Sequence, residues 1–212
     1  MMSVPTHQGD TATLILASRS ERRLKLLREH GFEPTVRVTD VEDGVLSAGR
    51  VCPEAWTIAL AYLKARAVFD TLPSEERRRA VVLAGDTVVE RDGRAFGKPR
   101  TPEDARKLLD MLSGGRHRVI SGICMLAEDA DSRLYDSATI HFGTLDPAML
   151  DRYIASSEWR GKAGGYNLED CLDAGWPIEV QGDPATVMGL PMKLLRQSIA
   201  ATLHEVGASA AA

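Results

Sequence analysis

The sequence predicts a mixed α/β fold, in which helices flank a twisted, partly antiparallel β-sheet and two lobes enclose a central cleft. Strand and helix patterns alternate in the first third of the chain, and a hairpin pattern dominates the middle. No segment rich in Pro, Gly or Ser divides the chain. We therefore expect a single domain over residues 13–206, preceded by a flexible lead-in at 1–12 and followed by a flexible tail at 207–212.

The N-terminal third is predicted to contain two strands and two helices. Residues 13–17 (TLILA) form a short apolar run before a turn signal, which favours a buried strand. From Ser20 the leucines cluster on one side of a helix that Gly31 ends. Residues 33–44 then form a strand with an acidic end, and Pro53 opens the second helix.

The remainder of the chain adds the antiparallel part of the sheet. Residues 80–96 predict a strand and hairpin with Asp92-Gly93 as the turn. A capped helix begins after Thr101, two strands follow at 117–127 and 137–145, and further helices start near Pro147 and Pro191. The glycine-rich segments 161–170 and 182–191 are predicted loops whose backbone approaches a strand or a ligand.

Composition limits the class of protein. The 212 residues are 44% hydrophobic and 26% charged, as is typical of globular domains. A net charge of −4 argues against sequence-independent binding to a nucleic acid polymer. No apolar stretch is long enough for a membrane span and no signal peptide pattern is present, so we expect a cytoplasmic protein that binds no membrane. Cys52, Cys124 and Cys171 lack metal-ligand spacing and are predicted to be reduced thiols.

Two arginines stand at the positive end of the first helix. If Ser20 is the N-cap, Arg22 and Arg23 occupy the second and third helical positions, where each cation costs about 0.3–1 kcal/mol. Free amides, a hydroxyl and two guanidinium groups together can bind a phosphate or pyrophosphate. Alternatively, the two arginines extend into water or pair with Glu21. Their spacing leaves both interpretations open.

Asp86 is the second candidate, because it follows VVLAG at the end of a predicted buried strand, where α/β sheets tend to bind ligands. It is otherwise a strand-end cap. Thr87 beside it is either a strand residue or a substrate contact. Lys64 and Lys98 are either ordinary solvated lysines or cations for an anionic ligand.

Glu42 belongs to an acidic cluster with Asp40 and Asp43. Such a cluster can hold a hard cation through oxygen ligands, or it can be an exposed strand end. The histidines lack the spacing of metalloprotease or serine hydrolase motifs and are predicted to be structural.

The order of the motifs resembles the Maf family of nucleoside triphosphate pyrophosphatases, which is named for an association with septum formation. The resemblance extends from about residue 13 to 195. The matching segments are LASRSERRLKLL, KA at 64–65, GDTVV, GKP, LSGGRHRVISG, KAGGYNLED and GDPATVMGLP.

This resemblance implies a Maf/ITPase-like fold and cleavage of a nucleoside triphosphate to the monophosphate and pyrophosphate. It also implies a divalent cation, Mg²⁺ or Mn²⁺, and a homodimer. The implied catalytic residues are Asp86 as general base, Glu42 and Lys98, with Glu42 and Asp86 as metal ligands. The implied phosphate contacts are Ser20, Arg22, Arg23, Lys64 and Lys98, and the implied base-choice positions are Arg22, Thr87 and Glu169.

Three positions depart from the family pattern. Glu21 replaces a proline, Gly85 replaces an alanine, and Glu169 replaces the glutamine of the pyrimidine-preferring members. An ionised carboxylate only accepts hydrogen bonds, which favours a base with N–H donors such as guanine, and a branch that prefers 7-methyl-GTP carries Glu near this position. Thr87 instead resembles the branch that acts on dTTP and UTP, so both substrate classes stay open.

Two rival functions remain at the level of sequence. Glu21 and Glu169 are compatible with a catalytically weak nucleotide-binding regulatory protein in cell-division control, although Asp86 and both lysines are retained. A nucleotide-binding phosphatase or transferase that uses the same anion site is the second rival.

Overall fold

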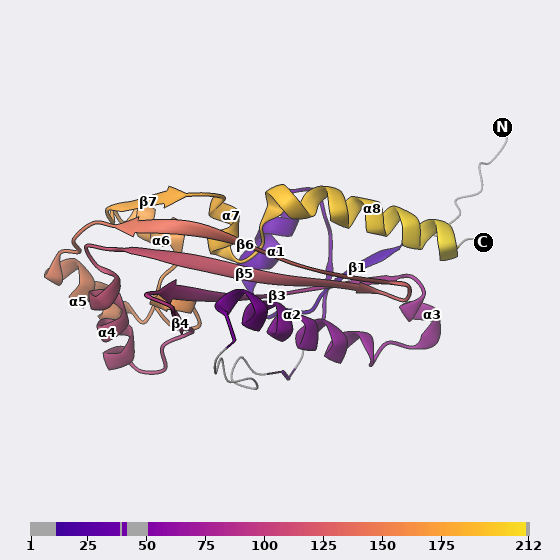
Figure 1. Cartoon of the computed structure of the whole chain (residues 1–212), viewed down its shortest axis with the longest axis horizontal. Helices are drawn as coiled ribbons and strands as arrows, with labels where there is room; N and C mark the ends of the chain where they lie inside the picture. Colours follow the sequence, from indigo (N-terminus) through magenta and orange to yellow (C-terminus); the bar gives the residue numbers. More distant parts are fainter. Residues whose placement is uncertain (1–11, 39, 42–50, 211–212) are drawn as a thin grey trace.

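The computed structural model describes residues 12–38, 40–41 and 51–210 (Figure 1). The strands are β1 (Thr13–Leu16), β2 (Thr35–Val36), β3 (Ala80–Arg91), β4 (Arg94–Phe96), β5 (Arg116–Ala127), β6 (Ala130–Phe142) and β7 (Ile178–Gln181). The helices are α1 (Glu21–Glu29), α2 (Pro53–Phe69), α3 (Ser74–Arg77), α4 (Pro102–Leu112), α5 (Pro147–Ser156), α6 (Leu168–Asp173), α7 (Pro184–Met188) and α8 (Met192–Ala210), with a 3₁₀ turn, η1, at Ala163–Gly165.

The strands form one mixed sheet in the order β2-β1-β3-β5-β6-β7, and β4 pairs with β3. Strand β1 runs parallel to β2 and β3, whereas the β3–β5, β5–β6, β6–β7 and β3–β4 pairs are antiparallel. The predicted mixed α/β class with flanking helices is confirmed. The hairpin turn at Asp92-Gly93 is also confirmed, since both residues have positive φ angles of 53° and 75°.

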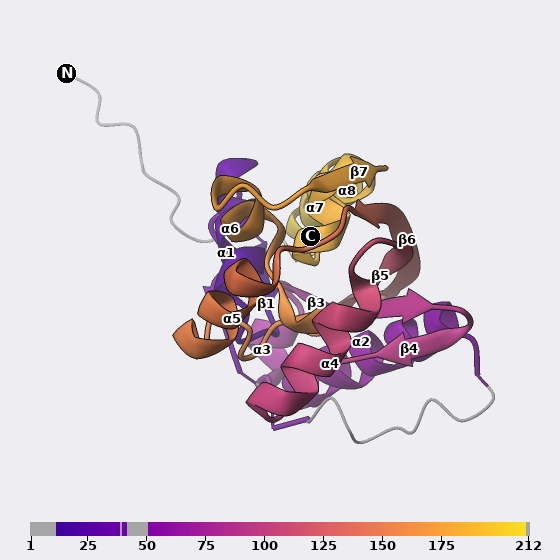
Figure 2. The same ribbon diagram turned by 90° about the vertical axis from the view of Figure 1, so that its left-hand side faces the viewer.

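Helices cover both faces of the sheet where β1 and β3 lie side by side. Along these strands alternate apolar side chains point to opposite faces, as period-two geometry requires. Leu14 and Leu83 pack with α1 and α8 on one face, whereas Ile15 and Val82 pack with α2 on the other. Figures 1 and 2 show α8 and α2 on opposite sides of the sheet.

The far ends of β3, β5 and β6 have a core of their own. Val89, Val119 and Phe142 pack there with side chains from α4, α5 and the segment around α6. Figure 2 shows α4 and α5 together at this end. The long central strands thus connect this core with the two cores that cover the faces of β1 and β3.

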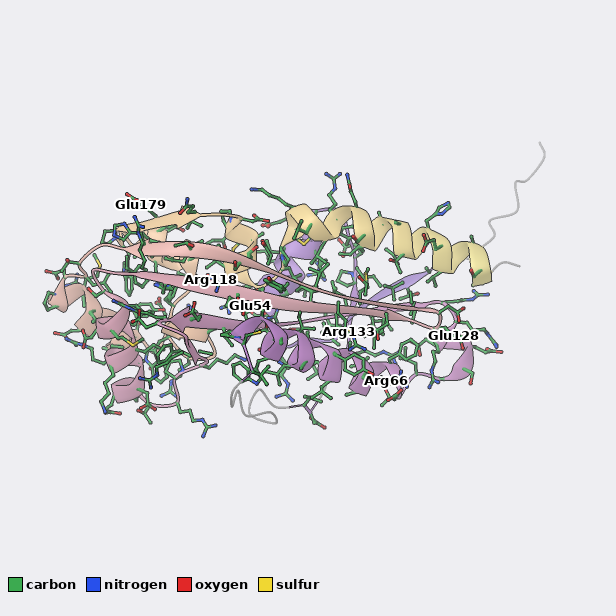
Figure 3. All side chains as sticks on the ribbon, viewed as in Figure 1. Glu54, Arg66, Arg118, Glu128, Arg133 and Glu179 are labelled. Atoms are coloured by element: carbon green, nitrogen blue, oxygen red, sulfur yellow. The ribbon has the colours of Figure 1, made fainter. Side chains whose placement is uncertain are left out.

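The close packing of α2 against the sheet depends on Gly122 of β5. An added Cβ at this position would lie 2.4 Å from the backbone nitrogen of Ile58 in α2. Arg118 of β5 also donates to Glu54 in the first turn of α2 at 2.7 Å, and Figure 3 shows these two labelled side chains beside the start of the helix. These contacts fix the position of α2, the helix that carries Lys64.

Several local predictions need correction. The C-terminal helix continues to Ala210, so residues 207–210 of the predicted loose tail are helical. Alanine is the best helix former and offsets the cost of Gly207. The glycine-rich segments are not loops throughout, because they contain α6 and α7, whose N-caps are Asn167 and Asp183. The predicted strand at 33–44 is reduced to the two residues of β2 in the part that is described.

Other expectations can be compared directly with the described residues. Cys52, Cys124 and Cys171 are free cysteines, and burial raises the pKa of both Cys124 and Cys171 to about 12. Such thiols stay protonated and unreactive at neutral pH. In the described part of the chain, no helix is long and apolar enough to cross a membrane.

Candidate functional site

A cleft of about 1070 Å³ lies between the N-terminus of α1 and the segment that leads into α6. This volume is at the upper end of ordinary small-molecule pockets. Charged and polar side chains line it, among them Ser20, Arg22, Lys64, Asp86 and Lys98. The structure therefore brings together most of the site residues that the sequence predicted, from four separate segments.

Lys64 and Asp86 meet on one side of the cleft. The ammonium nitrogen of Lys64 lies 2.5 Å from Oδ1 of Asp86, and their side chains are 10% and 6% exposed. Asp86 is in β3 directly opposite Gly122, the residue that lets α2 approach the sheet. The interpretation of Lys64 as an ordinary solvated lysine is therefore wrong.

The first helix begins as predicted. Ser20 is the N-cap of α1, and its hydroxyl accepts a hydrogen bond from the backbone nitrogen of Arg23 at 3.4 Å. Arg22 in the first turn lines the cleft. Burial lowers the pKa of its guanidinium, and the negative charge of Asp170 offsets part of that shift. Glu21 is exposed in the same turn and also borders the cleft.

Arg23 differs from its neighbour, because its guanidinium is buried among protein oxygens. It donates from Nε to the carbonyl oxygen of Gly189 at 3.0 Å, from Nη1 to Ser18 at 3.1 Å and from Nη2 to Thr87 at 2.9 Å. The residue is only 8% exposed. The interpretation of Arg22 and Arg23 as an exposed pair is thus wrong for Arg23, which links α1 to β3 and to the end of α7.

The hydroxyl of Thr87 has a defined direction in this network. Ser121 donates to the carbonyl oxygen of Thr186 at 2.8 Å, so its oxygen accepts from the Thr87 hydroxyl, also at 2.8 Å. Thr87 accepts in turn from Arg23. A hydroxyl has one donor and two acceptor lone pairs. Thr87 can therefore offer a ligand in the cleft an acceptor, but no donor.

The opposite wall of the cleft contains residues that the sequence analysis did not single out. Lys162, Tyr166, Asn167 and Asp170 all line it. Asp170 accepts from the ammonium group of Lys162 at 2.7 Å. Burial opposes ionisation of Asp170, but hydrogen bonds from Lys162 and Asn167 and the charge of Arg22 hold its pKa below the ordinary value. The carboxylate is therefore ionised at neutral pH.

Glu169 points elsewhere. Its carboxylate accepts from Lys25, on α1, at 2.8 Å. Among the described residues that line the cleft, Asp170 is present and Glu169 is not. The acidic pair Glu169-Asp170 was visible in the sequence, but its orientation was not, because successive helical residues point about 100° apart.

The predicted metal ligands are only partly within the described structure. Glu42 and Asp43 lie outside the described residues, whereas Asp40 borders the cleft and pairs with Arg19 at 3.4 Å. Within residues 12–38, 40–41 and 51–210, no three His, Cys, Asp or Glu side chains come together to hold a metal ion. Asp86 offers one hard oxygen donor, the kind of ligand that Mg²⁺ takes beside substrate phosphates.

The arrangement has a clear electrostatic character. Cationic side chains come from α1, α2, the Lys98 segment and the Lys162 segment, and Asp86 is the carboxylate buried among them. Cations aimed into a partly enclosed cleft stabilise a polyanionic ligand, and a carboxylate in their midst can orient water or take up a proton.

The chain was compared with family models, curated proteins and solved structures. A family model described as Maf-like protein matches residues 13–202. A "Nucleoside triphosphate pyrophosphatase" of Nocardia farcinica is 35% identical and covers 88% of this chain and 91% of its own length. A "dTTP/UTP pyrophosphatase" of Novosphingobium aromaticivorans is 38% identical, with coverages of 89% and 90%. The Ham1 protein of Staphylococcus aureus aligns at 18% identity with a TM-score of 0.42, over 61% of this chain and 71% of that chain.

Proposed function

Because the chain belongs to the Maf family, we propose that it hydrolyses a nucleoside triphosphate to the monophosphate and pyrophosphate. The observation that carries this proposal is the buried Lys64–Asp86 pair in a cleft lined with cations. A triphosphate carries about four negative charges near neutral pH, and such a ligand matches these cations. The names of the relatives support the same reaction class.

The phosphates bind to the cationic side of the cleft. The N-terminus of α1 supplies backbone amides and the hydroxyl of Ser20, and Arg22 extends from the same turn. Lys98 approaches from the β4–α4 connection and Lys64 from α2. Arg23 contributes mainly by holding this wall in place, because three of its N–H groups are donated to Ser18, Thr87 and Gly189.

Asp86 acts on the attacking water. A water oxygen forms a bond to the α-phosphorus, the bond from that phosphorus to the bridging oxygen breaks, and pyrophosphate leaves. Asp86 orients this water and accepts its proton, and the ammonium group of Lys64, 2.5 Å away, balances the charge of the carboxylate. Glu42 is proposed to assist at the same centre, and Lys98 to neutralise the charge that develops on the leaving pyrophosphate.

A divalent cation, Mg²⁺ or Mn²⁺, is part of the proposal. Asp86 and Glu42 would hold it together with phosphate oxygens, and it would supply charge neutralisation at the reacting phosphates. The ordinary preference of Mg²⁺ for one or two carboxylates plus substrate oxygens supports this assignment.

The base faces the wall that contains Asp170. Arg22 donates hydrogen bonds and the ionised Asp170 accepts them, so together they match a base edge that has a carbonyl oxygen beside an N–H. Uracil, thymine and guanine have that edge, whereas adenine and cytosine present the reverse order. Thr87 adds an acceptor. Glu169 binds Lys25 outside the cleft lining and is proposed to have little effect on base choice.

A panel of nucleoside triphosphates tests the reaction. Each is incubated with the protein and Mg²⁺ or Mn²⁺, and the products are separated. Monophosphate and pyrophosphate in equal amounts are expected, with loss of turnover on adding EDTA and recovery on restoring the cation. Orthophosphate as the product would instead identify a phosphatase or transferase, and tight binding without turnover would identify a nucleotide-binding regulator.

A further inference from the structure

Two buried side chains beside the cleft have no role in the proposed reaction. His117 of β5 is 3% exposed, and its Nε2 lies 2.8 Å from the hydroxyl oxygen of Tyr166. Its ring also packs edge-on against Phe142 and Tyr166, with centroids 5.2 and 5.8 Å away. Burial and the charge of Arg91 lower the pKa of His117 to about 4, so a neutral imidazole makes this contact at pH 7.

Tyr166 connects this contact to the η1 turn. It follows the turn directly, and it lines the cleft. Gly164 within the turn has a φ of +71°, and an added Cβ there would lie 3.1 Å from Cε1 of Tyr166 and 2.5 Å from Val89. The backbone of the turn therefore rests against the tyrosine ring and β3, where only glycine fits.

The η1 turn also contacts both neighbours of Lys98, which are Gly97 and Pro99. The backbone nitrogen of Gly164 donates to the carbonyl oxygen of Gly97 at 3.0 Å. An added Cβ on Gly165 would lie 3.4 Å from Cγ of Pro99. Lys98 itself lines the cleft and is exposed to solvent. A continuous series of contacts thus extends from His117 to the backbone on either side of Lys98.

We propose that His117 is a positioning residue for Lys98. By holding Tyr166 it fixes the η1 turn, and the turn holds the Lys98 segment so that the ammonium group faces the cleft. The inference rests on the proposed function for the identity of the ligand, a nucleoside triphosphate, that Lys98 meets. It assigns His117 no contact with substrate.

A double-mutant cycle separates positioning from general stability. Tyr166→Phe removes only the hydroxyl group, and we expect it to lower kcat/KM by about 2- to 12-fold, the net effect of one neutral hydrogen bond. In a Lys98→Ala background the same substitution should change kcat/KM by less than about twofold, because no ammonium group remains to be positioned. Equal losses in both backgrounds, or no loss in either, would overturn the inference.

Two further variants complete the cycle. Tyr135→Phe is the matched control, since Tyr135 is 48% exposed on β6, and we expect it to leave kcat/KM unchanged. His117→Gln changes the other partner of the same hydrogen bond, the one between His117 and Tyr166. If Tyr166→Phe loses its cooperative thermal transition, His117→Gln replaces it in the cycle with Lys98→Ala. The loss of kcat/KM in the two backgrounds is then compared in the same way.

Binding of a nucleoside triphosphate analogue with a methylene group between the α- and β-phosphates is measured by calorimetry on the same proteins. If the substitutions at Tyr166 and Lys98 are coupled in their effect on analogue binding but the wild-type protein shows no turnover, the proposed reaction is rejected and the positioning role is supported. Turnover with independent effects of the two substitutions would reject the positioning role alone. A wild-type protein that neither turns over nor binds these nucleotides would reject both.

Discussion

The ammonium nitrogen of Lys64 lies 2.5 Å from a carboxylate oxygen of Asp86, and both side chains are almost completely buried. The two residues come from α2 and from β3, and Gly122 on the neighbouring strand allows the helix to come close enough. Burying two opposite charges is favourable only when they are well paired. A pair of this kind beside a cleft lined with cations is typical of a site where charge is used in chemistry.

Asp86→Asn is expected to abolish turnover while the protein stays folded. The amide retains the shape of the side chain and an oxygen acceptor for Lys64, but it can no longer take a proton, so the rate should fall at least about 100-fold. Pyrophosphate release measures the rate and circular dichroism the fold. Asp110→Asn, at an exposed carboxylate paired with Arg106, is the control. Near wild-type turnover in Asp86→Asn would remove this residue from the mechanism.

Asp170→Asn should change the ranking of substrates. An amide donates as well as accepts, so the match to a base edge with an N–H is weakened and the preference over ATP and CTP should fall by about tenfold. Glu169→Gln, which alters the neighbouring carboxylate at Lys25, should leave the ranking within about twofold. The measurement is kcat/KM for each triphosphate. A change of ranking in Glu169→Gln alone would return base choice to Glu169.

Arg23→Lys is expected to destabilise the fold. A lysine has a single nitrogen and cannot reach Ser18, Thr87 and Gly189 at once, so buried acceptors lose their donors at a cost of about 2–4 kcal/mol. Urea denaturation gives the free energy of unfolding. Arg28→Lys, on the same helix but exposed, should change it by less than about 0.5 kcal/mol. Equal stabilities of the two variants would contradict the role assigned to Arg23.

The stability of the protein should depend on pH through His117. Its pKa is about 4 in the folded protein and about 6.5 when unfolded, so between these values the unfolded chain binds the extra proton. Stability is therefore unaffected by this group above pH 6.5 and is lost as the pH falls toward 4, by about 3 kcal/mol in all. Urea denaturation at a series of pH values from 7 to 4.5 measures the slope.

The variant His117→Gln should lose that part of the pH dependence, since glutamine does not titrate. His141→Gln, at a half-exposed histidine near Glu179, should retain it. An unchanged slope in His117→Gln would show that other groups cause the loss of stability in acid.

Local rules were sufficient for most of the secondary structure. Ser20 and Thr101 were recognisable as N-caps, and each accepts a hydrogen bond from the helix that it precedes. These signals act within a few residues, so they can be found without knowledge of the fold. The short helices α6 and α7 were missed because so few residues form a helix only when tertiary contacts support it.

The membership of the candidate site was also largely visible in the sequence. The motif order indicated Ser20, Arg22, Lys64, Asp86 and Lys98, and the structure gathers all five around one cleft. Their residue types suit a polyanion, and their order along the chain is that of the Maf family.

Only the tertiary structure decided how individual side chains are directed. Arg23 donates to Gly189, which is 166 positions away in the chain, and no local pattern reveals such a partner. Asp170 rather than Glu169 lines the cleft because α6 packs with one particular side toward it. The sequence by itself thus determined most of the elements, because caps and turns act within a few residues, and the order of its motifs indicated which residues line the cleft. Packing between distant segments determined which of those residues face the ligand.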